Sequence, residues 1–404
     1  MKKVLIYIFS ILLVLLFSYS AKAERDPLLE TLIEKGIISE EEAIKIESKE
    51  KSLIMVDQSK GLYTLKGENF EIGGTLWLDY VDAQYDKTSA GETDKSNSYF
   101  KLNKFCLKPK ITLADNIVLA SQLDFRESGT NLNEAHLTFS RLPLNTFVKV
   151  GLEDRFIKPS PAKVVFFPLI GTAFWYNDDV GIQLGGDHQS LYWRLSVTNG
   201  LKLGSYKTAR DNSFKIINDA RNTSESNYNK EVGVGLGIKH NLGDTAKIDL
   251  LGFYYSGELS DDDKNFLQGI PGYGTSEDDT KNFGGARATL DIRNFTLIGE
   301  YITAKDGEMD RDGWYVQPSY TFRVKDWKYF NSFKFAVQYG ELNVDLPNDP
   351  SSSLTWDRKK TTFALCINIH KDIILKTEYY INDEDTGNGD VDNNEFFMQL
   401  VVNF

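Results

Sequence analysis

The sequence predicts an all-β protein, a transmembrane antiparallel β-barrel of about 16 strands that follows a short helical segment. Three observations support this prediction. Apolar and polar residues alternate with a period of two from residue 71 to 404, the connections are by turns short and long, and the chain opens with a secretory signal. Outer-membrane barrels have short periplasmic turns and longer external loops, so an even strand number with both termini in the periplasm explains the pattern.

The two kinds of connection define two different ends of the predicted barrel. The short connections lie near 113–115, 141–145, 188–190, 241–245, 292–294 and 370–372. The long, polar connections lie near 86–98, 152–178, 200–230, 257–281, 341–359 and 381–394. The short ones are expected in the periplasm and the long ones outside the cell.

Residues 1–23 have the three parts of a signal peptide. Met1 to Lys3 are charged at the start, Val4 to Tyr19 are largely apolar, and Ala21 to Ala23 form a small-residue cleavage site. A membrane anchor is the alternative, but an anchor needs roughly 20 apolar residues. We therefore expect cleavage after Ala23 and export of the remaining chain.

Residues 24–70 are expected to form a helical periplasmic leader and linker. Apolar residues recur at helical spacing, the pattern breaks at Gly36, and Ser39 followed by Glu42 has the spacing of a capping box. Two roles remain open for this segment: an element for oligomerisation or attachment to the envelope, and a solvated leader.

From residue 71 onward the barrel domain follows a strand period. Phe333, Phe335 and Val337 share one face of a strand, and Lys334 and Gln338 share the other. Roughly sixteen strands enclose a space too wide for side chains to fill, so we expect a wet interior lined by the polar faces. The apolar faces would then contact outer-membrane lipid and lipopolysaccharide.

The C-terminal strand carries two further predictions. Its apolar stripe ends at Phe404, which resembles the signal that the barrel-insertion machinery reads. An open sheet edge cannot survive in hydrocarbon, so this strand must pair with the first one, near Gly73 to Tyr80. Pro318 lies inside a predicted strand and cannot donate to its ladder, which predicts a local bulge there.

Composition and single residues argue against several classes of function. The formal net charge of −12 makes nucleic acid an unsuitable partner. Cys106 and Cys366 fall on strands that are far apart around a closed barrel, so no disulfide is expected. The four histidines are scattered, and Gly233 to Gly237 lie in an alternating strand with no helix after them, so the glycines are interpreted as small residues facing the lumen. We expect no enzyme and no cofactor.

Several segments together resemble the phosphate-selective porin O and P family from about residue 71 to 404. The segments are 98–108, 133–137, 148–151, 179–186, 194–200 and 313–320, the last reading Gly-Trp-Tyr-Val-Gln-Pro-Ser-Tyr. The resemblance implies a sixteen-stranded porin, usually trimeric, with a basic constriction that favours anions. This chain departs from the family at Glu153-Asp154 and at Asn177-Asp178, where acidic or neutral residues replace expected bases. Both signs of ion selectivity therefore stay open.

The side chains expected in the pore follow from strand parity and from the third external loop. The pore-lining candidates are Lys101, Arg126, Arg194, Lys239, Arg287, Arg323, Lys334 and Lys376, with Lys247 beside them. Acids of the same parity are Asp79, Asp124, Glu231, Asp249, Asp291, Glu300 and Glu378. The constriction candidates are Glu153, Asp154, Arg155, Lys158 and Lys163. The apolar run 164–170 in this loop is expected to pack inside the wall or at a subunit contact.

Three functions remain to be compared. The leading one is a passive diffusion channel for small hydrophilic solutes, including anions such as phosphate, in the outer membrane of a Gram-negative-type bacterium. The alternatives are a closed-lumen barrel for ligand binding or adhesion and an outer-membrane hydrolase. Acidic runs at 261–263, 277–279 and 383–392 offer oxygen ligands for calcium but lack the spacing of an EF-hand, and no metal site is predicted.

Overall fold

The computed structural model separates the chain into two units, Met1–Met55 and Val56–Phe404. The structure describes residues 33, 35, 39, 42, 55–56, 65–66, 69–85, 95–127, 129–159, 165, 168–174, 178–207, 213–221, 229–270, 272–324, 327, 330–348, 357–385, 390–392 and 394–404. The signal peptide 1–23, Gly36 and most of the predicted leader therefore lie outside the described residues.

The first unit contains the predicted capping box. The backbone N–H of Glu42 donates to Ser39 Oγ at 3.2 Å, and the backbone N–H of Ser39 donates to Glu42 Oε2 at 2.9 Å. These reciprocal bonds satisfy two amides at a helix start. They also lower the pKa of the Glu42 carboxyl. The prediction for this pair is confirmed.

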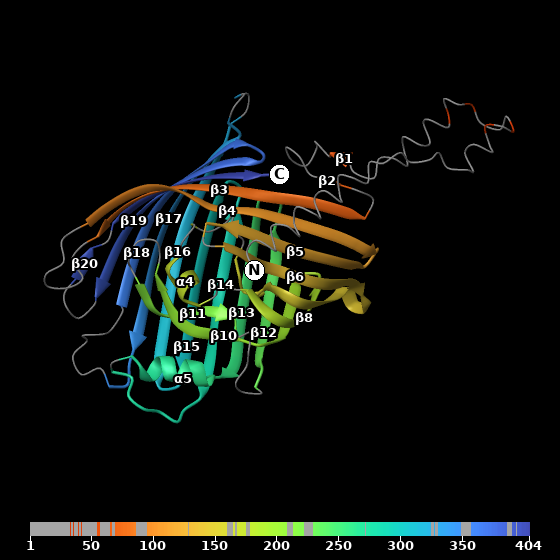
Figure 1. Ribbon diagram of the computed structural model, residues 1–404. Coiled ribbons are helices and arrows are strands. Elements are labelled where there is room, and N and C mark those ends of the chain that lie inside the picture. The colour runs from red at the N-terminus through yellow and green to blue at the C-terminus, as the bar shows by residue number, and fades with distance from the viewer. Residues whose placement is uncertain are drawn as a thin grey trace. The chain divides into compact units, whose positions relative to one another are not determined.

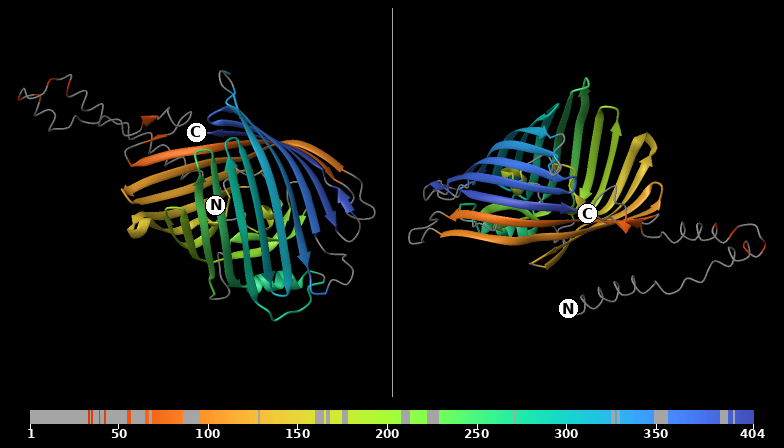
Figure 2. Two further views of the ribbon diagram at one scale, coloured as in Figure 1. Left: turned by 180° about the vertical axis from the view of Figure 1, so that it is seen from behind. Right: turned by 90° about the horizontal axis from the view of Figure 1, so that it is seen from above.

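In the second unit, sixteen strands of the described part of the chain pair into a closed antiparallel barrel (Figures 1 and 2). They are β3 (Phe70–Tyr85), β4 (Lys95–Ala114), β5 (Ile117–Arg126), β6 (Gly129–Leu142), β7 (Thr146–Asp154), β8 (Asp178–His188), β9 (Leu191–Thr198), β12 (Glu231–Leu242), β13 (Ala246–Glu258), β14 (Thr280–Ile292), β15 (Phe295–Asp306), β16 (Met309–Arg323), β17 (Ser332–Asp345), β18 (Asp357–His370), β19 (Ile373–Asp385) and β21 (Glu395–Asn403). The predicted fold class is confirmed.

Shorter elements lie before the barrel and in its connections. They are β1 (Met55–Val56), β2 (Leu65–Lys66), the 3₁₀ turn η1 (Pro143–Asn145), α4 (Leu169–Phe174), β10 (Leu201–Lys207), β11 (Ser213–Arg221), α5 (Asp261–Gln268) and β20 (Asp390–Asp392). Strands β10 and β11 form a hairpin of their own, and β9 pairs directly with β12 across it. No helix in the described residues is long and apolar enough to cross a membrane.

The barrel closes where the sequence predicts. Strand β21 pairs antiparallel with β3 from Glu395 opposite Ala83 to Asn403 opposite Thr75. At the end of this seam, Gly74 and Phe404 exchange backbone hydrogen bonds of 2.7 and 3.0 Å. Closure leaves neither edge strand exposed, which hydrocarbon requires.

The two faces of the wall follow the period of two. In β12, Glu231 and the glycines after it are buried, and Val232, Val234, Leu236 and Ile238 are exposed. Leu236 alone is 64% exposed. Large apolar side chains left open in this way suit a hydrocarbon environment, so the exposed face is the outer one.

The short connections predicted from the sequence join consecutive strands in every case. Gln189 and Arg293 have positive φ angles of 53° in two of these turns, as two-residue hairpins require. Two further tight connections, 127–128 and 307–308, fall at the opposite end, between the long loops. External loops therefore vary in length more than the sequence indicates.

The prediction of a bulge at Pro318 is wrong. The pairing of β15 with β16 runs through Leu297 opposite Pro318 with no shift of register. The pairing of β16 with β17 only skips Gln317 and Pro318 and resumes in the same register at Ser319 opposite Ala336. The missing N–H of proline thus interrupts the pairing between β16 and β17, but no extra residue is inserted and no bulge forms.

An apolar cluster, the luminal core, lies against the inner face of β13 to β17. Its members are Ile157, Leu169, Ile170, Ala173, Phe174, Tyr192, Ile217, Leu251, Phe253, Tyr255, Phe283, Ile298, Ile302, Ala304, Tyr315 and Leu342. Helix α4 and strand β11 supply part of it, and both lie on the inner side of the wall in Figures 1 and 2. The expectation that polar faces line the whole interior is wrong for this part of the wall.

Candidate channel interior

Arg155 begins the loop after β7 and folds against the inner side of the wall. It is 2% exposed, and its guanidinium forms ion pairs with Asp179 at 3.3 Å and with Glu231. The guanidinium also lies 4.6 and 5.2 Å from the ring centres of Tyr255 and Phe283. Burial opposes the charge, but the carboxylates of Glu231 and Asp179 outweigh it and raise the pKa of Arg155. Arg155 therefore holds the root of the loop on the wall.

The other constriction candidates lie around the same root. Glu153 forms an ion pair with Lys149, which lies four residues before it on β7. Lys158 forms an ion pair with Asp154. Lys163 lies outside the described residues. The structure thus brings four of the five candidates together as two short-range ion pairs and one buried arginine.

The glycines of β12 make room for aromatic rings on the inner face. A Cβ atom at Gly235 would lie 2.7 Å from the ring of Phe156, and one at Gly237 would lie 2.0 Å from the ring of Tyr192. Phe156 itself stacks on Tyr255 with ring centres 5.1 Å apart. The glycines therefore leave this part of the inner face of β12 without side chains, and aromatic rings pack against it. This agrees with the interpretation of these glycines as small residues that face the lumen.

The loop after β7 crosses the interior from one part of the wall to another. Near its root, the carbonyl oxygen of Ile157 accepts a hydrogen bond of 2.6 Å from Arg287 on β14. Further on, the N–H of Val165 donates to Gln317 on β16 at 3.0 Å, and Val165 packs against Ala336 on β17. The described part of the predicted apolar run thus packs inside the wall.

Helix α4 ends this loop and joins a second loop, which sequence reasoning did not assign to the site. All six of its residues are buried. The carbonyl oxygen of Phe174 accepts a hydrogen bond of 3.0 Å from the side chain of Asn218 on β11. Asn218 Oδ1 in turn accepts one of 3.0 Å from Arg311 on β16, and Arg311 pairs with Asp306 at 2.6 Å. Asn218 stands in a polar loop without periodicity, so no sequence signal marks it.

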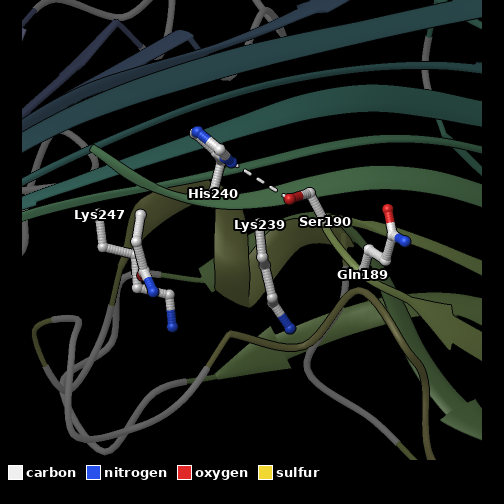
Figure 3. Close-up of a pocket in the computed structure, with 6 residues that line it drawn as sticks. Gln189, Ser190, Lys239, His240 and Lys247 are labelled. Carbon is white, nitrogen blue, oxygen red and sulfur yellow. Dashed lines mark hydrogen bonds between the residues drawn. The ribbon is translucent and has the colours of Figure 1, made fainter. Parts of the chain in front are cut away.

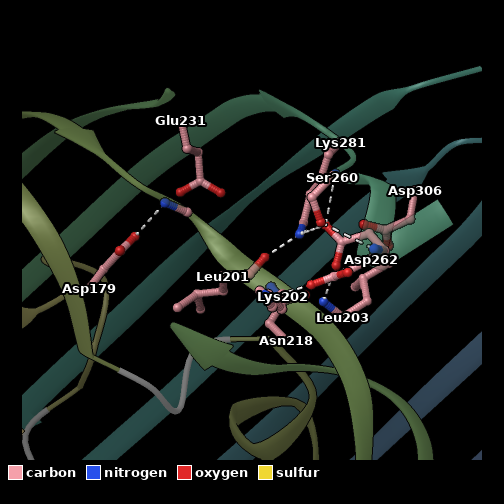
Figure 4. A network of polar contacts seen from close by, with 12 residues as sticks. Asp179, Leu201, Lys202, Leu203, Asn218, Glu231, Ser260, Asp262, Lys281 and Asp306 are labelled. Atoms are coloured by element: carbon pink, nitrogen blue, oxygen red, sulfur yellow. Dashed lines mark hydrogen bonds and ion pairs between the residues drawn. The ribbon is translucent and has the colours of Figure 1, made fainter. Parts of the chain in front are cut away.

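The start of the hairpin is tied to α5 and β14 (Figure 4). Asp263 accepts the backbone N–H of Leu203 at 2.6 Å and pairs with Lys281 at 2.9 Å. Lys202 pairs with Asp262 at 2.5 Å on the exposed side. Both strands of the hairpin are therefore fixed: β10 binds α5 through Asp263, and β11 binds α4 and β16 through Asn218.

Several of the inner acids are surrounded by hydrogen-bond donors. Asp124 is fully buried, and it accepts hydrogen bonds from Gln122 and Asn133 and pairs with Lys104 and Arg126, each at 3.2 Å. Other inner acids accept hydrogen bonds from neutral side chains: Asp79 from Asn103 and Gln399, Glu378 from Tyr380, and Asp249, whose side chain is 28% exposed, from Tyr192. These carboxylates are hydrogen-bonded within the wall, and Asp124 is also paired with cations.

The eight pore-lining candidates lie on eight different strands. Arg126, Lys239 and Arg323 are exposed, and Lys101, Arg194, Arg287, Lys334 and Lys376 are half-buried. Arg194 pairs with Asp187 at 2.9 Å. Lys239 lies 3.9 Å from Asp249 and over the ring of Tyr192. These eight cations therefore keep more contact with solvent than the buried acids Asp79, Asp124, Glu300 and Glu378 do.

A cavity of about 370 Å³ opens at the tight-turn end of β12 and β13 (Figure 3). Lys239, Lys247, Gln189 and Ser190 are among its lining residues. Ser190 Oγ lies 3.2 Å from His240 Nδ1, and both groups are exposed. Among the described residues no carboxylate is bonded to His240, so the pair is not a hydrolase triad.

Acidic side chains are abundant, but they do not converge. Within the described ranges, no group of three histidine, cysteine or acidic side chains is close enough to hold a metal ion. Asp263, from one of the runs considered for calcium, is instead the acid that caps α5 together with Ser260. Residues 386–389 of the last acidic loop lie outside the described residues.

Phe404 lies at the seam of the barrel. Its ring stacks on Phe105 with centres 5.7 Å apart, and a Cβ at Gly74 would lie 2.3 Å from it. Gly74 thus leaves the space that this ring fills. The terminal phenylalanine covers the closing pair of strands.

No protein-family model matches the chain, and no curated protein matches it in sequence. Its structure is similar to OprB of Pseudomonas putida, with a TM-score of 0.57 at 9% identity over 83% of this chain and 94% of that one. The outer membrane channel DcaP of Acinetobacter baumannii gives 0.55 at 14% identity over 83% and 97%. The anion-selective porin from Comamonas acidovorans gives 0.53 at 10% identity over 83% and 99%.

At such low identities the likeness establishes the fold. It extends over the barrel and nearly the full length of each compared chain. Together with the closed sheet and its apolar outer face, it means that the chain has the porin barrel fold, which is the architecture of the Gram-negative outer membrane.

Proposed function

We propose that the chain is a passive outer-membrane diffusion channel for small hydrophilic solutes that prefers anions such as phosphate. The proposed family is that of the phosphate-selective porins O and P, on the segments quoted above. The fold supports a channel because a barrel of this strand number is wider than its own side chains can fill. The proposal includes a homotrimer in contact with lipid and lipopolysaccharide, as the family resemblance implies.

One observation supports the anion preference most directly: along β4 and β5 the inner acid Asp124 is buried and paired, and the cation Arg126 beside it remains accessible. The cluster around Asp124 holds two cations, Lys104 and Arg126, and so retains one positive charge. Asp124 has 0% side-chain exposure, and Arg126 has 39%. A solute that moves along this wall meets ammonium and guanidinium groups before it meets carboxylates, which favours anions.

The narrow part of the channel is proposed to lie at the root of the loop after β7. Glu153, Asp154, Arg155, Lys158 and Lys163 would surround it. Arg155 would act by holding the loop, because its charge is neutralised by two buried acids. Lys158, with 26% side-chain exposure, is the described cation of this set that a passing anion would meet, next to its ion-pair partner Asp154 with 35%.

The test is a reversal potential. Purified protein in a planar bilayer should give stepwise ohmic currents, and a potassium chloride gradient should give a reversal potential of the sign for chloride. Replacing Arg126 and Lys239 together with glutamine should move the potential toward cation preference. A cation-selective wild-type channel would remove the anion proposal and leave the channel.

A closed-lumen barrel is the second candidate, and the luminal core is the observation that favours it. This core fills the interior along β13 to β17 with apolar side chains, which water does not wet. If no currents appear under several salts, the core closes the bore and a binding or adhesion role replaces the channel.

A further inference from the structure

The interior of the barrel is narrowed by two loops that form one packed unit. The loop after β7 contributes residues 155–159, 165 and 168–174, and the loop after β9 contributes the hairpin β10–β11. Ile217 of the hairpin belongs to the same buried cluster as Ile170 and Phe174 of α4. The two loops therefore share one apolar core.

A polar bridge lies at the edge of that core. Asn218 is 3% exposed, donates to the carbonyl oxygen of Phe174 and accepts from Arg311. Arg311 is 2% exposed and lies over the ring of Phe174 at 5.0 Å. One amide side chain thus joins the hairpin to the helix and to the wall at the same time.

Because this bridge is buried, losing its hydrogen bonds should destabilise the packing of the two loops. Breaking a hydrogen bond costs little in water, but a buried donor or acceptor left without its partner loses its full solvation. The carbonyl of Phe174 and the guanidinium of Arg311 would both be affected by the loss of Asn218. Neither group reaches solvent while the luminal core stays packed.

We propose that the hairpin β10–β11, locked to α4 and to Arg311 through Asn218, sets the size limit of the channel together with the loop after β7. Asn218 is a positioning residue in this proposal, because it acts through α4. The solute path then runs off-centre, along the wall of β3 to β7 and β19 to β21, since the luminal core occupies the side of β13 to β17 and Val165 packs on Ala364 of β18. The inference rests on the proposed channel function.

Two variants of Asn218 separate the two contacts. Asn218→Leu removes both hydrogen bonds at similar volume. Asn218→Asp keeps an acceptor for Arg311 and removes the donor to Phe174. Lys202→Ala is the matched control, because Lys202 lies on the same hairpin and its partner Asp262 has 67% side-chain exposure.

The first readout does not depend on conduction. Hydrogen exchange of the peptide that covers 168–174 should be slow in the wild type, and in Asn218→Leu it should be roughly 5- to 150-fold faster, from the cost of buried unpaired groups. Asn218→Asp should also be faster, by less, and Lys202→Ala should match the wild type. Heat-dependent migration in gels verifies that each barrel is folded.

The second readout is the channel itself. Asn218→Leu should raise single-channel conductance and admit larger neutral polyethylene glycols than the wild type, and Lys202→Ala should do neither. Faster exchange with unchanged conductance and size limit would overturn the proposal, as would unchanged exchange in a folded Asn218→Leu protein. A wild type without currents would instead refute the channel function, and the exchange experiment would still report on the lock.

Discussion

Replacement of Arg155 with leucine should destabilise the protein strongly, because it removes the partner of two buried acids. Asp179 and Glu231 are 3% and 5% exposed, and Arg155 lies between them and two aromatic rings. Breaking a buried ion pair by removing one partner costs about 3–5 kcal/mol, since the remaining charge stays in a poor solvent. Two carboxylates share this arginine, so the upper part of that range is expected.

Two comparison variants isolate the cause. Arg155→Lys keeps the charge and loses the planar contact with Tyr255 and Phe283, which costs about 0.5–2 kcal/mol. Arg194→Leu removes an inner-wall arginine whose partner Asp187 has 57% side-chain exposure. Pairs that reach solvent contribute about 0–1 kcal/mol, and Arg194 also lies 5.2 Å from the ring centres of Phe147 and Tyr192, contacts that contribute about 0.5–2 kcal/mol. This variant should therefore lose less than Arg155→Leu, because it leaves no buried carboxylate without a partner.

The assay is unfolding by urea in lipid vesicles, followed by tryptophan fluorescence and by heat-dependent gel migration. The expected order of stability is wild type, then Arg194→Leu and Arg155→Lys together, and last Arg155→Leu. If Arg155→Leu and Arg194→Leu lose the same free energy of unfolding, Arg155 does not neutralise buried acids and the account of the loop root is wrong.

Three further predictions follow from the same contacts. Gly237→Leu should lower the free energy of unfolding in the urea assay by about 1–3 kcal/mol, because its Cβ atom would clash with the ring of Tyr192. Gly252→Ala should be neutral, because its Cβ would have no contact closer than 4.0 Å. Equal effects of the two variants would contradict the packing of Tyr192 on Gly237. Deletion of residues 156–170 should raise single-channel conductance and change ion preference, and an unchanged channel would mean that the loop is not the constriction. Phe404→Ala should lower the yield of folded barrel in cells, because the ring covers the seam at Gly74, and a yield equal to that of the matched outer-face variant Phe100→Ala would argue against an assembly role.

The wall of the barrel was predictable because its signals are local. A period of two assigns each strand, and the alternation of short and long connections orients the strands. Closure follows from the chemistry of hydrocarbon, which is why the pairing at Gly74 and Phe404 could be expected from two segments at opposite ends of the domain.

The interior was harder because its contacts are long-range. On β13, Leu251, Phe253 and Tyr255 face inward while Leu250 and Tyr254 face outward. Apolar residues on both faces carry no alternation, so the pattern cannot tell a dry inner wall from a lipid-facing one. The two loops that fold onto these side chains bury them and keep the inner face dry.

Pro318 and Asn218 show the same limit at single residues. A proline has no N–H to donate to the hydrogen bonds between strands, but its effect on register depends on the neighbouring strand. Here Gln317 and Pro318 are left out of the pairing with β17, and the register does not change. Asn218 has no local signal because its role comes from Phe174 and Arg311, which lie 44 and 93 positions away.

The most direct test of the account is ionic current through single purified molecules in a bilayer with unequal salt on its two sides. The account predicts discrete open steps and a zero-current voltage displaced toward the equilibrium value for the anion. Silent membranes that contain correctly folded barrel, or a displacement toward the cation, would contradict it.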